Sequence, residues 1–377
     1  LTGVAVHWSK ENMYSTLNTD TEEHIKNVNF IDESNVDEPD NAPYGDVEER
    51  NIFMKQIELS LKKNDEIPIT SFCTVPESVV KLPTKEGATA FQRQYPVPHT
   101  LKPVLQNQID EWLESGTIVK STVNTSFNSP LLLVPKRNGK GEIVSHRVCM
   151  DTRALNRLLP DNNYPVPLIR DIFNSLAGMK VFTTLDLKSA YNRFLVHPDD
   201  QHKLTFTFNN QQYSFQGMCF GVKTVTSLFC KVMDIIFQDF DCVRTYVDDC
   251  IVASKDLETH AKDVAKVIDR LTSVNLILNQ DKCHWAQKSV YMLGFVVTEM
   301  GTMVDPRKLK TVNNWPTPRS GKDIQRFMGL VNYFREYIPK ISQVAAPLDC
   351  LRNVTDIRSH WTDEHHKSFL ALKSILN

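Results

Sequence analysis

Residues 243–254 read VRTYVDDCIVAS, and this stretch decides how the rest of the chain is interpreted. Apolar and β-branched residues stand on both sides of Asp248 and Asp249, a pattern typical of a tight β-hairpin with the two aspartates in its turn. Two carboxylates held this close repel each other unless a cation lies between them. Taken alone, an Asp-Asp pair favours the simpler interpretation, a hairpin whose aspartates are solvated turn formers.

A second β-rich run changes that balance. Residues 181–186 read VFTTLD and end on a third carboxylate, Asp186. A carboxylate at the end of one strand meets a hairpin turn only if both lie side by side in one sheet. Three carboxylates at strand ends, two of them adjacent, form a hard-oxygen site suited to Mg²⁺. The sequence therefore predicts a Mg²⁺ site made by Asp186, Asp248 and Asp249.

Composition narrows the class of protein. The 377 residues suffice for two or three domains, and 41% hydrophobic with 23% charged residues is typical of a soluble protein. No run reaches the roughly 20 apolar residues that span a membrane, and the eight cysteines are scattered without a CxxC pair. We therefore expect no membrane partner and a reducing intracellular setting. Because the first residue is Leu, we also expect a segment of a longer product.

Charge is distributed unevenly along the chain. Residues 1–66 hold 15 Asp/Glu and 6 Lys/Arg, whereas the remainder holds 30 and 37. The acidic head, rich in Asn and Ser, predicts a largely disordered acidic linker over residues 1–66, with a short helix at 52–61. The mildly basic body is compatible with nucleic-acid binding, but so small a balance is a weak indication by itself.

Hydrophobic periodicity predicts an α+β body followed by a helical module. The predicted helices cover residues 99–115, 227–237, 257–276, 306–315, 322–338 and 362–376. The predicted strands cover residues 130–134, 143–150, 204–208, 213–215 and 289–297, the last bent at Gly294. We expect His260, on the helix over 257–276, to be a surface residue rather than a metal ligand.

From residue 67 onward the chain resembles, in colinear order, the reverse transcriptases of gypsy-type LTR retrotransposons and, more distantly, the retroviral enzymes. The matching motifs are LLLVPKRNGKG, HRVCMDTRALNRLLP, YPVPLIRDI, FTTLDLKSAYNRFLVHPDDQHKLTF, FGVK, TYVDD, YMLGF and WPTPRSGKDIQRFMGLVNYFREYIPK. The resemblance implies a right-hand polymerase with fingers, a palm built on an antiparallel sheet, and a helical thumb. Fingers and palm would cover residues 67–298, the thumb 299–350, and the start of a connection towards an absent ribonuclease H domain 351–377.

The resemblance also implies residue roles. Asp186, Asp248 and Asp249 would be the palm carboxylates that hold two Mg²⁺ ions, for which Mn²⁺ is a substitute. Tyr191 would lie under the sugar and exclude ribonucleotides; the alternative for Tyr191 is a packed core aromatic. The other implied nucleotide-binding residues are Lys136, Arg147, Phe220 and Gly221. The implied primer- and template-binding residues are Met292, Leu293, Gly294, Phe295, Lys322, Arg326 and Arg335.

The resulting prediction is an RNA-directed DNA polymerase that extends a primer with deoxynucleotides on a retrotransposon RNA template. Its expected partners are RNA or DNA template with primer, dNTPs, the protease, ribonuclease H and integrase of a Pol polyprotein, and a second copy in a homo-oligomer. We expect it in the cytoplasm, in virus-like particles, or in the nucleus. No Asp-Ser/Thr-Gly protease signature occurs in residues 1–66.

Two alternatives stay open. The family usually has Pro shortly after an FGLKN motif, whereas residues 224–227 here read TVTS, and Cys250 stands where the family has an aliphatic residue. A non-catalytic nucleic-acid-binding scaffold subunit or a decayed copy is therefore the first alternative. An unrelated Mg²⁺ enzyme such as a nuclease is the second, and the fingers and thumb motifs disfavour it.

Overall fold

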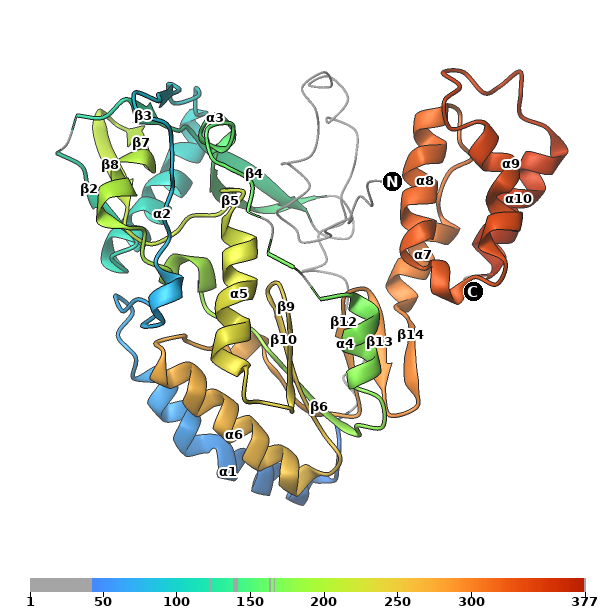
Figure 1. The fold of residues 1–377 in the computed structure, drawn as a ribbon, viewed down its shortest axis with the longest axis horizontal. Coiled ribbons are helices and arrows are strands. Elements are labelled where there is room, and N and C mark those ends of the chain that lie inside the picture. Colours follow the sequence, from blue (N-terminus) through green and yellow to red (C-terminus); the bar gives the residue numbers. More distant parts are fainter. Residues whose placement is uncertain (1–42, 123, 138–141, 163, 166, 376–377) are drawn as a thin grey trace. The chain divides into compact units, whose positions relative to one another are not determined.

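A four-stranded antiparallel sheet, covered by one long helix with a second long helix packed on that helix, forms the centre of the larger of two units (Figure 1). The computed structural model describes residues 43–122, 124–137, 142–162, 164–165 and 167–375, and it divides into units 43–290 and 291–375. The strand order is β11-β6-β10-β9. These strands are β6 (Val181–Leu185), β9 (Val243–Tyr246), β10 (Asp249–Ser254) and β11 (His284–Gln287). The predicted adjacency of the 181–186 strand and the hairpin is confirmed, because β10 pairs with both β6 and β9.

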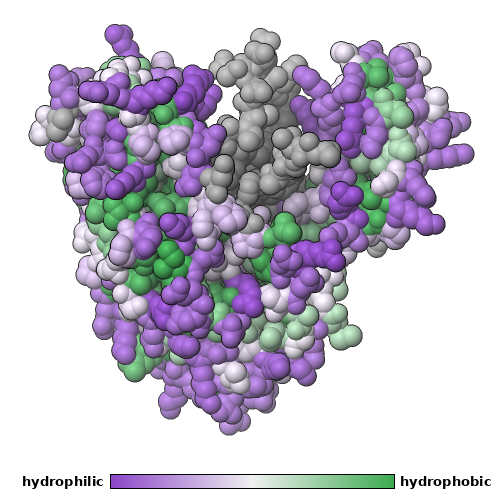
Figure 2. All heavy atoms as spheres, viewed as in Figure 1, coloured by the Kyte–Doolittle hydropathy of each residue, from purple (hydrophilic) through white to green (hydrophobic). Residues whose placement is uncertain are grey.

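Helix α6 (Leu257–Ser273) packs on β10 and β6, and α1 (Val47–Asp65) lies along α6 (Figure 1). The sequence explains α1, since Asp46 and Glu49 form a reciprocal capping box at its start. Phe53, Ile57 and Leu61 then recur every four residues and are buried on one face. The visible outer surface of this helical layer is mostly hydrophilic (Figure 2), as expected for amphipathic helices.

The predicted linker over residues 1–66 is wrong at its C-terminal end. Residues 47–65 form one continuous helix whose apolar side chains belong to the core, and the predicted helix over 52–61 is only its middle. The acidic composition of residues 1–66 favoured a disordered linker. The capping box and the four-residue spacing of apolar residues nevertheless indicate a helix. Residues 1–42 lie outside the described part of the chain.

A second antiparallel sheet has the order β2-β8-β7. Its strands are β2 (Ile118–Lys120), β7 (Thr205–Phe208) and β8 (Gln211–Phe215), and helix α2 (Lys102–Glu114) packs beside β2. Trp112 of α2 meets the rings of Phe206 and Phe215 at centroid distances of 6.2 and 5.2 Å. The helix predicted over residues 99–115 and the hairpin predicted over 204–215 are both confirmed.

The rest of the larger unit consists of a long hairpin and short elements around α5. Strands β4 (Leu131–Arg137) and β5 (Ile143–Met150) pair with each other, and residues 138–141, the predicted turn, lie outside the described residues. The remaining elements are β1 (Ala90–Phe91), β3 (Phe127–Asn128), α3 (Arg153–Asn156), α4 (Ile169–Ser175) and α5 (Val225–Phe237). Single 3-10 turns are η4 (Pro76–Ser78), η5 (His99–Leu101), η6 (Ala190–Arg193), η7 (Pro198–Lys203) and η8 (Gln280–Lys282).

The smaller unit starts with a three-stranded sheet, β12-β13-β14, and continues as helices. Its elements are β12 (Ser289–Met292), β13 (Phe295–Thr298), β14 (Gly301–Val304), α7 (Pro306–Asn313), α8 (Gly321–Tyr333), η9 (Arg335–Tyr337), α9 (Ile341–Cys350) and α10 (Asp363–Ile375). Asp305 caps α7, since its carboxylate accepts from the Arg307 main-chain N–H. Phe327 of α8 and Phe369 of α10 meet at 4.8 Å in its core.

The α+β class is confirmed, with one correction in the smaller unit. The helix predicted over residues 322–338 ends at Tyr333, and Arg335 follows in a separate 3-10 turn. The two units divide at residues 290/291. The boundaries of fingers and palm, thumb and connection at 298/299 and 350/351 stay predictions. None of the helices in the described ranges is long and apolar enough to cross a membrane.

Candidate active site

The turn between β9 and β10 differs by one residue from the prediction. Asp249 pairs with Tyr246, so the two turn residues are Val247 and Asp248, and Asp249 is the first residue of β10. Val247 has a φ of 52° and a buried side chain. A positive φ is unusual for a β-branched residue and is a form of strain found at functional sites. Because Val247 packs inward, the turn presents Asp248, which is exposed together with Asp249.

Strand pairing brings Asp186 next to the hairpin. The register of β6 and β10 runs from Val181 opposite Ser254 to Leu185 opposite Cys250. One step further in the same register, Asp186 stands opposite Asp249. The adjacent ends of β6 and β10 agree with the predicted pairing of the two strands, while the three-carboxylate metal site stays a prediction.

The pKa of the Asp248 carboxyl is influenced by its burial and by the charge of Asp186. Desolvation by the surrounding protein and the negative charge of Asp186 raise the pKa of the Asp248 carboxyl, and a hydrogen bond from Tyr191 opposes this rise. Repulsion between neighbouring carboxylates of this kind is relieved by a bound cation. The site therefore has an excess of negative charge at one end of the sheet.

The donor set fits a divalent cation chemically. Ionised carboxylates offer only acceptor oxygens, which are the ligands that Mg²⁺ and Mn²⁺ prefer. In the described ranges, however, no three His, Cys, Asp or Glu side chains are already arranged as a coordination shell. Asp186, Asp248 and Asp249 are thus candidates by chemistry and by strand register.

Tyr191 and Phe220, both predicted to line a nucleotide pocket, lie against each other. Tyr191 is in η6 and only 2% exposed, and its ring contacts Phe220 at 5.0 Å and Phe229 at 5.1 Å, both edge-on. Its packing therefore agrees with a core aromatic, while its hydroxyl bonds to the carboxylate of Asp248. Selection against ribonucleotides by Tyr191 stays a prediction.

The turn at Gly221 is anchored by two residues that the sequence reasoning missed. The Gly221 carbonyl accepts from Thr152 Oγ1 at 2.7 Å and from Asn156 Nδ2 at 2.8 Å. Asn156 Oδ1 in turn accepts from the Lys223 main-chain N–H at 3.0 Å. Gly221 has a φ of 95°, a conformation that favours glycine. These bonds hold the Phe220–Gly221 turn against α3. In the sequence, only the quoted motif HRVCMDTRALNRLLP, which contains Thr152 and Asn156, pointed to them.

The segment that departs from the family pattern still forms a helix. Helix α5 begins at Val225, directly after Thr224. Thr224 adopts a helical backbone conformation and its side chain caps no main-chain N–H. Its hydroxyl oxygen is buried and makes no hydrogen bond to the described residues. The departure therefore leaves the start of α5 intact but places a buried hydroxyl, with no hydrogen-bond partner among the described residues, three residues after Gly221.

Lys136 and Arg147 lie on the same face of the β4–β5 hairpin. Lys136 pairs with Ser145 and Val134 pairs with Arg147, which makes the two cations diagonal neighbours on one face. The opposite face is apolar and carries Leu131 and Val148, both buried. The hairpin thus presents two positive charges on the side away from its packed face.

The remaining predicted residues belong to the smaller unit. Leu293 and Gly294 form the two-residue turn between β12 and β13, both with positive φ, while Met292 and Phe295 are buried. Lys322 and Arg326 are exposed on α8, and Arg335 is exposed on η9. Their roles in binding primer and template stay predictions.

The expectation that His260 is a surface residue is wrong. His260 has no exposed surface, and its ring nitrogens bond Thr183 Oγ1 at 2.7 Å and Ser254 Oγ at 3.0 Å. Its ring stacks on Phe53 of α1 at 5.8 Å. The helical spacing of the 257–276 segment places residue 260 between apolar positions 257, 261 and 264, but only the presence of α1 closes off its outer side.

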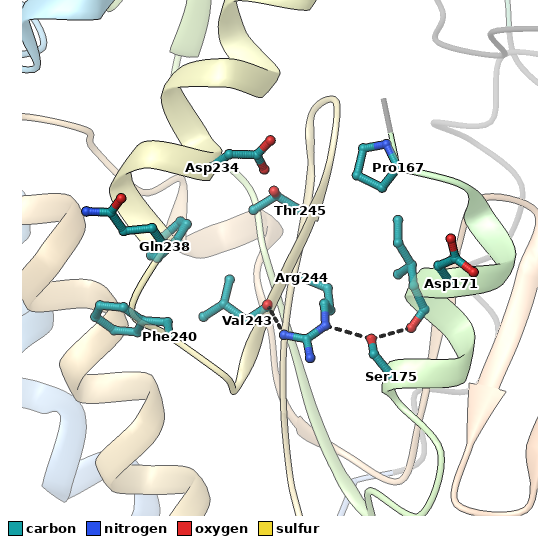
Figure 3. A pocket seen from close by; sticks show the side chains of 11 residues that line it. Pro167, Asp171, Ser175, Asp234, Gln238, Phe240, Val243, Arg244 and Thr245 are labelled. Atoms are coloured by element: carbon teal, nitrogen blue, oxygen red, sulfur yellow. Dashed lines mark hydrogen bonds between the residues drawn. The ribbon is translucent and has the colours of Figure 1, made fainter. Parts of the chain in front are cut away.

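A cleft of about 340 Å³ lies between α4, the end of α5 and β9 (Figure 3). Arg244 of β9 crosses it, and its Nε donates to Ser175 Oγ of α4 at 2.6 Å. Asp171 and Asp234 also line the cleft, so its charge is mixed. None of the predicted site residues lines it, and the bond from Arg244 to Ser175 connects β9 to α4.

An antiparallel sheet with aspartates at adjoining strand ends has the architecture expected of a polymerase palm. Residues 134–297 match the family described as reverse transcriptase (RNA-dependent DNA polymerase). This range contains the three aspartates, Lys136, Arg147 and the Phe220–Gly221 turn. Residues 134–297 are therefore a reverse transcriptase domain, and members of this family generally use divalent metal ions.

Curated relatives place this domain among retrotransposons. The chain is 34% identical over 260 residues to the retrovirus-related Pol polyprotein from transposon opus of Drosophila melanogaster, covering 68% of this chain and 26% of the relative. It is 32% identical over 295 residues to the transposon Tf2-3 polyprotein of Schizosaccharomyces pombe, covering 78% and 22%. The chain thus spans about a quarter of the length of these relatives, and the matches support a gypsy-type retrotransposon reverse transcriptase.

Solved structures agree with this assignment. A foamy viral protease-reverse transcriptase in complex with double-stranded DNA matches with a TM-score of 0.77 and 26% identity, over 89% of this chain and 69% of that one. The same viral protein in complex with an RNA/DNA hybrid matches with a TM-score of 0.74 and 25% identity, over 89% and 45%. The fold is that of a reverse transcriptase.

Proposed function

We propose that this chain is an RNA-directed DNA polymerase that adds deoxynucleotides to a primer 3′-hydroxyl while copying retrotransposon RNA. The observation that carries the proposal is the strand register that sets Asp186 beside Asp249, with Asp248 in the adjoining turn, inside the reverse transcriptase match. Carboxylates at adjoining strand ends repel one another unless a cation binds, which supports a metal-dependent role.

In this proposal Asp186, Asp248 and Asp249 hold two Mg²⁺ ions, with Mn²⁺ as a substitute. When bound, these ions would lower the pKa of the primer 3′-hydroxyl and neutralise negative charge on the departing pyrophosphate. Tyr191 orients the Asp248 carboxylate through its hydroxyl and closes the pocket below the sugar. Lys136 and Arg147 bind the triphosphate oxygens, because two cations on one hairpin face suit a multiply charged ligand.

The proposed partners follow from the relatives. Template with primer, as RNA/DNA hybrid or double-stranded DNA, would contact Met292–Phe295 and the cationic residues Lys322, Arg326 and Arg335. The structures of foamy viral protease-reverse transcriptase in complex with these nucleic acids support that choice. The proposed protein partners are the protease, ribonuclease H and integrase of the same Pol polyprotein and a second copy of the chain. The proposed location is the cytoplasm, a virus-like particle or the nucleus.

Primer extension on poly(rA)/oligo(dT) with Mg²⁺ or Mn²⁺ tests the polymerase function. We expect extension by the wild type and none by Asp248→Asn, with template-primer affinity largely unchanged in both. Wild-type binding without extension would favour the scaffold or decayed copy, for which the unpartnered Thr224 hydroxyl is the specific observation. Equal extension by Asp248→Asn would remove the metal assignment.

Nucleotide selection is tested separately at Tyr191. We expect Tyr191→Ala to admit ribonucleotides and Tyr191→Phe to keep excluding them, because the phenylalanine ring keeps the bulk and loses only the hydroxyl. A Tyr191→Ala enzyme that still rejects ribonucleotides would leave Tyr191 as a packing residue.

A further inference from the structure

The chain just after Asp186 is held in place by an extended segment, residues 276–279. Asn279 N–H donates to the Asp186 carbonyl at 2.8 Å, and Lys188 N–H donates to the Ile277 carbonyl at 2.7 Å. Leu278 and Leu187 form an antiparallel bridge between these two bonds. Because the main-chain groups of an extended segment alternate in direction, the other edge of residues 276–279 is turned away from Asp186 and needs its own partners.

Asn64, near the end of α1, supplies those partners. Its Oδ1 accepts from the Leu278 N–H at 2.8 Å, and its Nδ2 donates to the Leu276 carbonyl at 2.9 Å. Nδ2 also donates to Thr272 Oγ1 at 2.9 Å. The side-chain amide therefore acts as a short piece of strand that pairs with the outer edge of the segment. Asn64 has no exposed surface, and its two bonds to the main chain of Leu276 and Leu278 are buried.

A second connection runs from the same segment back to Asp186. The Asp186 N–H donates to Cys283 Sγ at 3.4 Å, and the Cys283 thiol donates to the Asn279 carbonyl at 3.3 Å. Both main-chain polar groups of Asp186 are thus bonded to residues 279–283. The position of Asp186 therefore depends on how firmly residues 276–279 are held. Asn64 is a buried residue that holds the outer edge of this segment.

We propose that Asn64 is a positioning residue for Asp186, acting through residues 276–279 to fix the carboxylate that binds metal. The inference rests on the proposed function, since it takes Asp186 as a metal ligand. Asn64 is 122 residues from Asp186 in the chain and lies outside residues 134–297, the part matched by the family. Groups that orient metal ligands change metal affinity or activity about 10- to 100-fold when removed.

The test compares variants of the full chain by direct Mn²⁺ binding, followed by electron paramagnetic resonance of the free ion. We expect Asn64→Ala to weaken Mn²⁺ binding about tenfold. Single-nucleotide incorporation should show a similar rise in the half-saturating Mg²⁺ concentration and a lower kcat. The template-primer Kd, measured by fluorescence anisotropy, should stay unchanged.

Two control variants separate positioning from general stability. Ile57→Val removes one buried methyl group from α1 two turns before Asn64, and Gln280→Ala removes an exposed bond of 2.8 Å from Gln280 to Asp65. Both should bind Mn²⁺ as the wild type does. If Asn64→Ala does not fold, Thr272→Val, which loosens the Asn64 amide without removing it, should weaken Mn²⁺ binding about threefold.

The outcomes are distinguishable. Unchanged Mn²⁺ binding in a folded Asn64→Ala, or in Thr272→Val if the former does not fold, overturns the inference and leaves Asn64 with a structural role. An equal loss of Mn²⁺ binding in Ile57→Val also overturns it, since any weakening of α1 would then suffice. A wild-type chain that binds template-primer but extends no primer refutes the proposed function itself.

Discussion

His260 makes the stability of the helical layer depend on pH. It is buried between Thr183 of β6 and Ser254 of β10, and Phe53 of α1 stacks on its ring. Burial lowers the pKa of His260 from 6.5 to about 3, and the nearby charge of Asp256 opposes this only in part. The folded chain therefore keeps the imidazole neutral at every pH where the protein is handled.

The sign and size of the effect follow from linkage. The unfolded chain protonates this histidine below pH 6.5, whereas the folded chain does not until about pH 3. Stability is therefore fully present above pH 6.5 and is lost as the pH falls towards 3. At about 1.4 kcal/mol per pKa unit, the loss is roughly 5 kcal/mol over the whole window and about 2 kcal/mol between pH 7.5 and 5.0.

The assay is urea unfolding at pH 7.5 and 5.0 of the wild type and of His260→Gln, which keeps hydrogen-bonding groups but does not titrate. Between the two pH values the wild type should lose about 2 kcal/mol more of its unfolding free energy than the variant. His99→Gln, at an exposed position, is the matched control and should behave as the wild type. Equal losses in the wild type and His260→Gln would refute the reasoning.

Three further predictions concern the catalytic hairpin, α5 and α1. Asp248→Asn should raise the melting temperature at pH 7, because the raised pKa of Asp248 means that its ionised carboxylate destabilises the folded chain. The gain in melting temperature should vanish below the pKa that this aspartate has in the unfolded chain. Thr224→Val should raise the unfolding free energy by about 1 kcal/mol by removing an unpartnered buried hydroxyl, whereas Thr183→Val, whose hydroxyl bonds His260 and the Ala286 N–H, should lower it. Deleting residues 1–66 should abolish soluble expression, because three buried apolar side chains of α1 contribute roughly 2 kcal/mol each to stability. A chain that starts at residue 43 is the control and should stay soluble, because it keeps every described contact.

The elements with clear local patterns were predictable. The alternation on both sides of Asp248 and Asp249 predicted β9 and β10, and the four-residue spacing after residue 257 predicted α6. The turn register was not predictable, because Asp-Asp is a better turn pair by residue preference than Val-Asp. Tertiary packing overrode that preference by burying Val247 at a strained φ.

The sequence by itself determined strands β4 to β10, β12 and β13, most helices, the three aspartates and, through its motifs, the family. Only the tertiary structure decided that α1 belongs to the core, that His260 is buried and neutral, and that Asn64 braces the segment beside Asp186. The physical reason is the distance along the chain between the residues that interact. Periodicity and turn preference record contacts between residues a few positions apart, whereas Asn64 bonds Leu276 and Leu278 across 212 and 214 residues. A hydrophilic residue near the end of an acidic segment carries no local sign that a distant extended segment will need its amide.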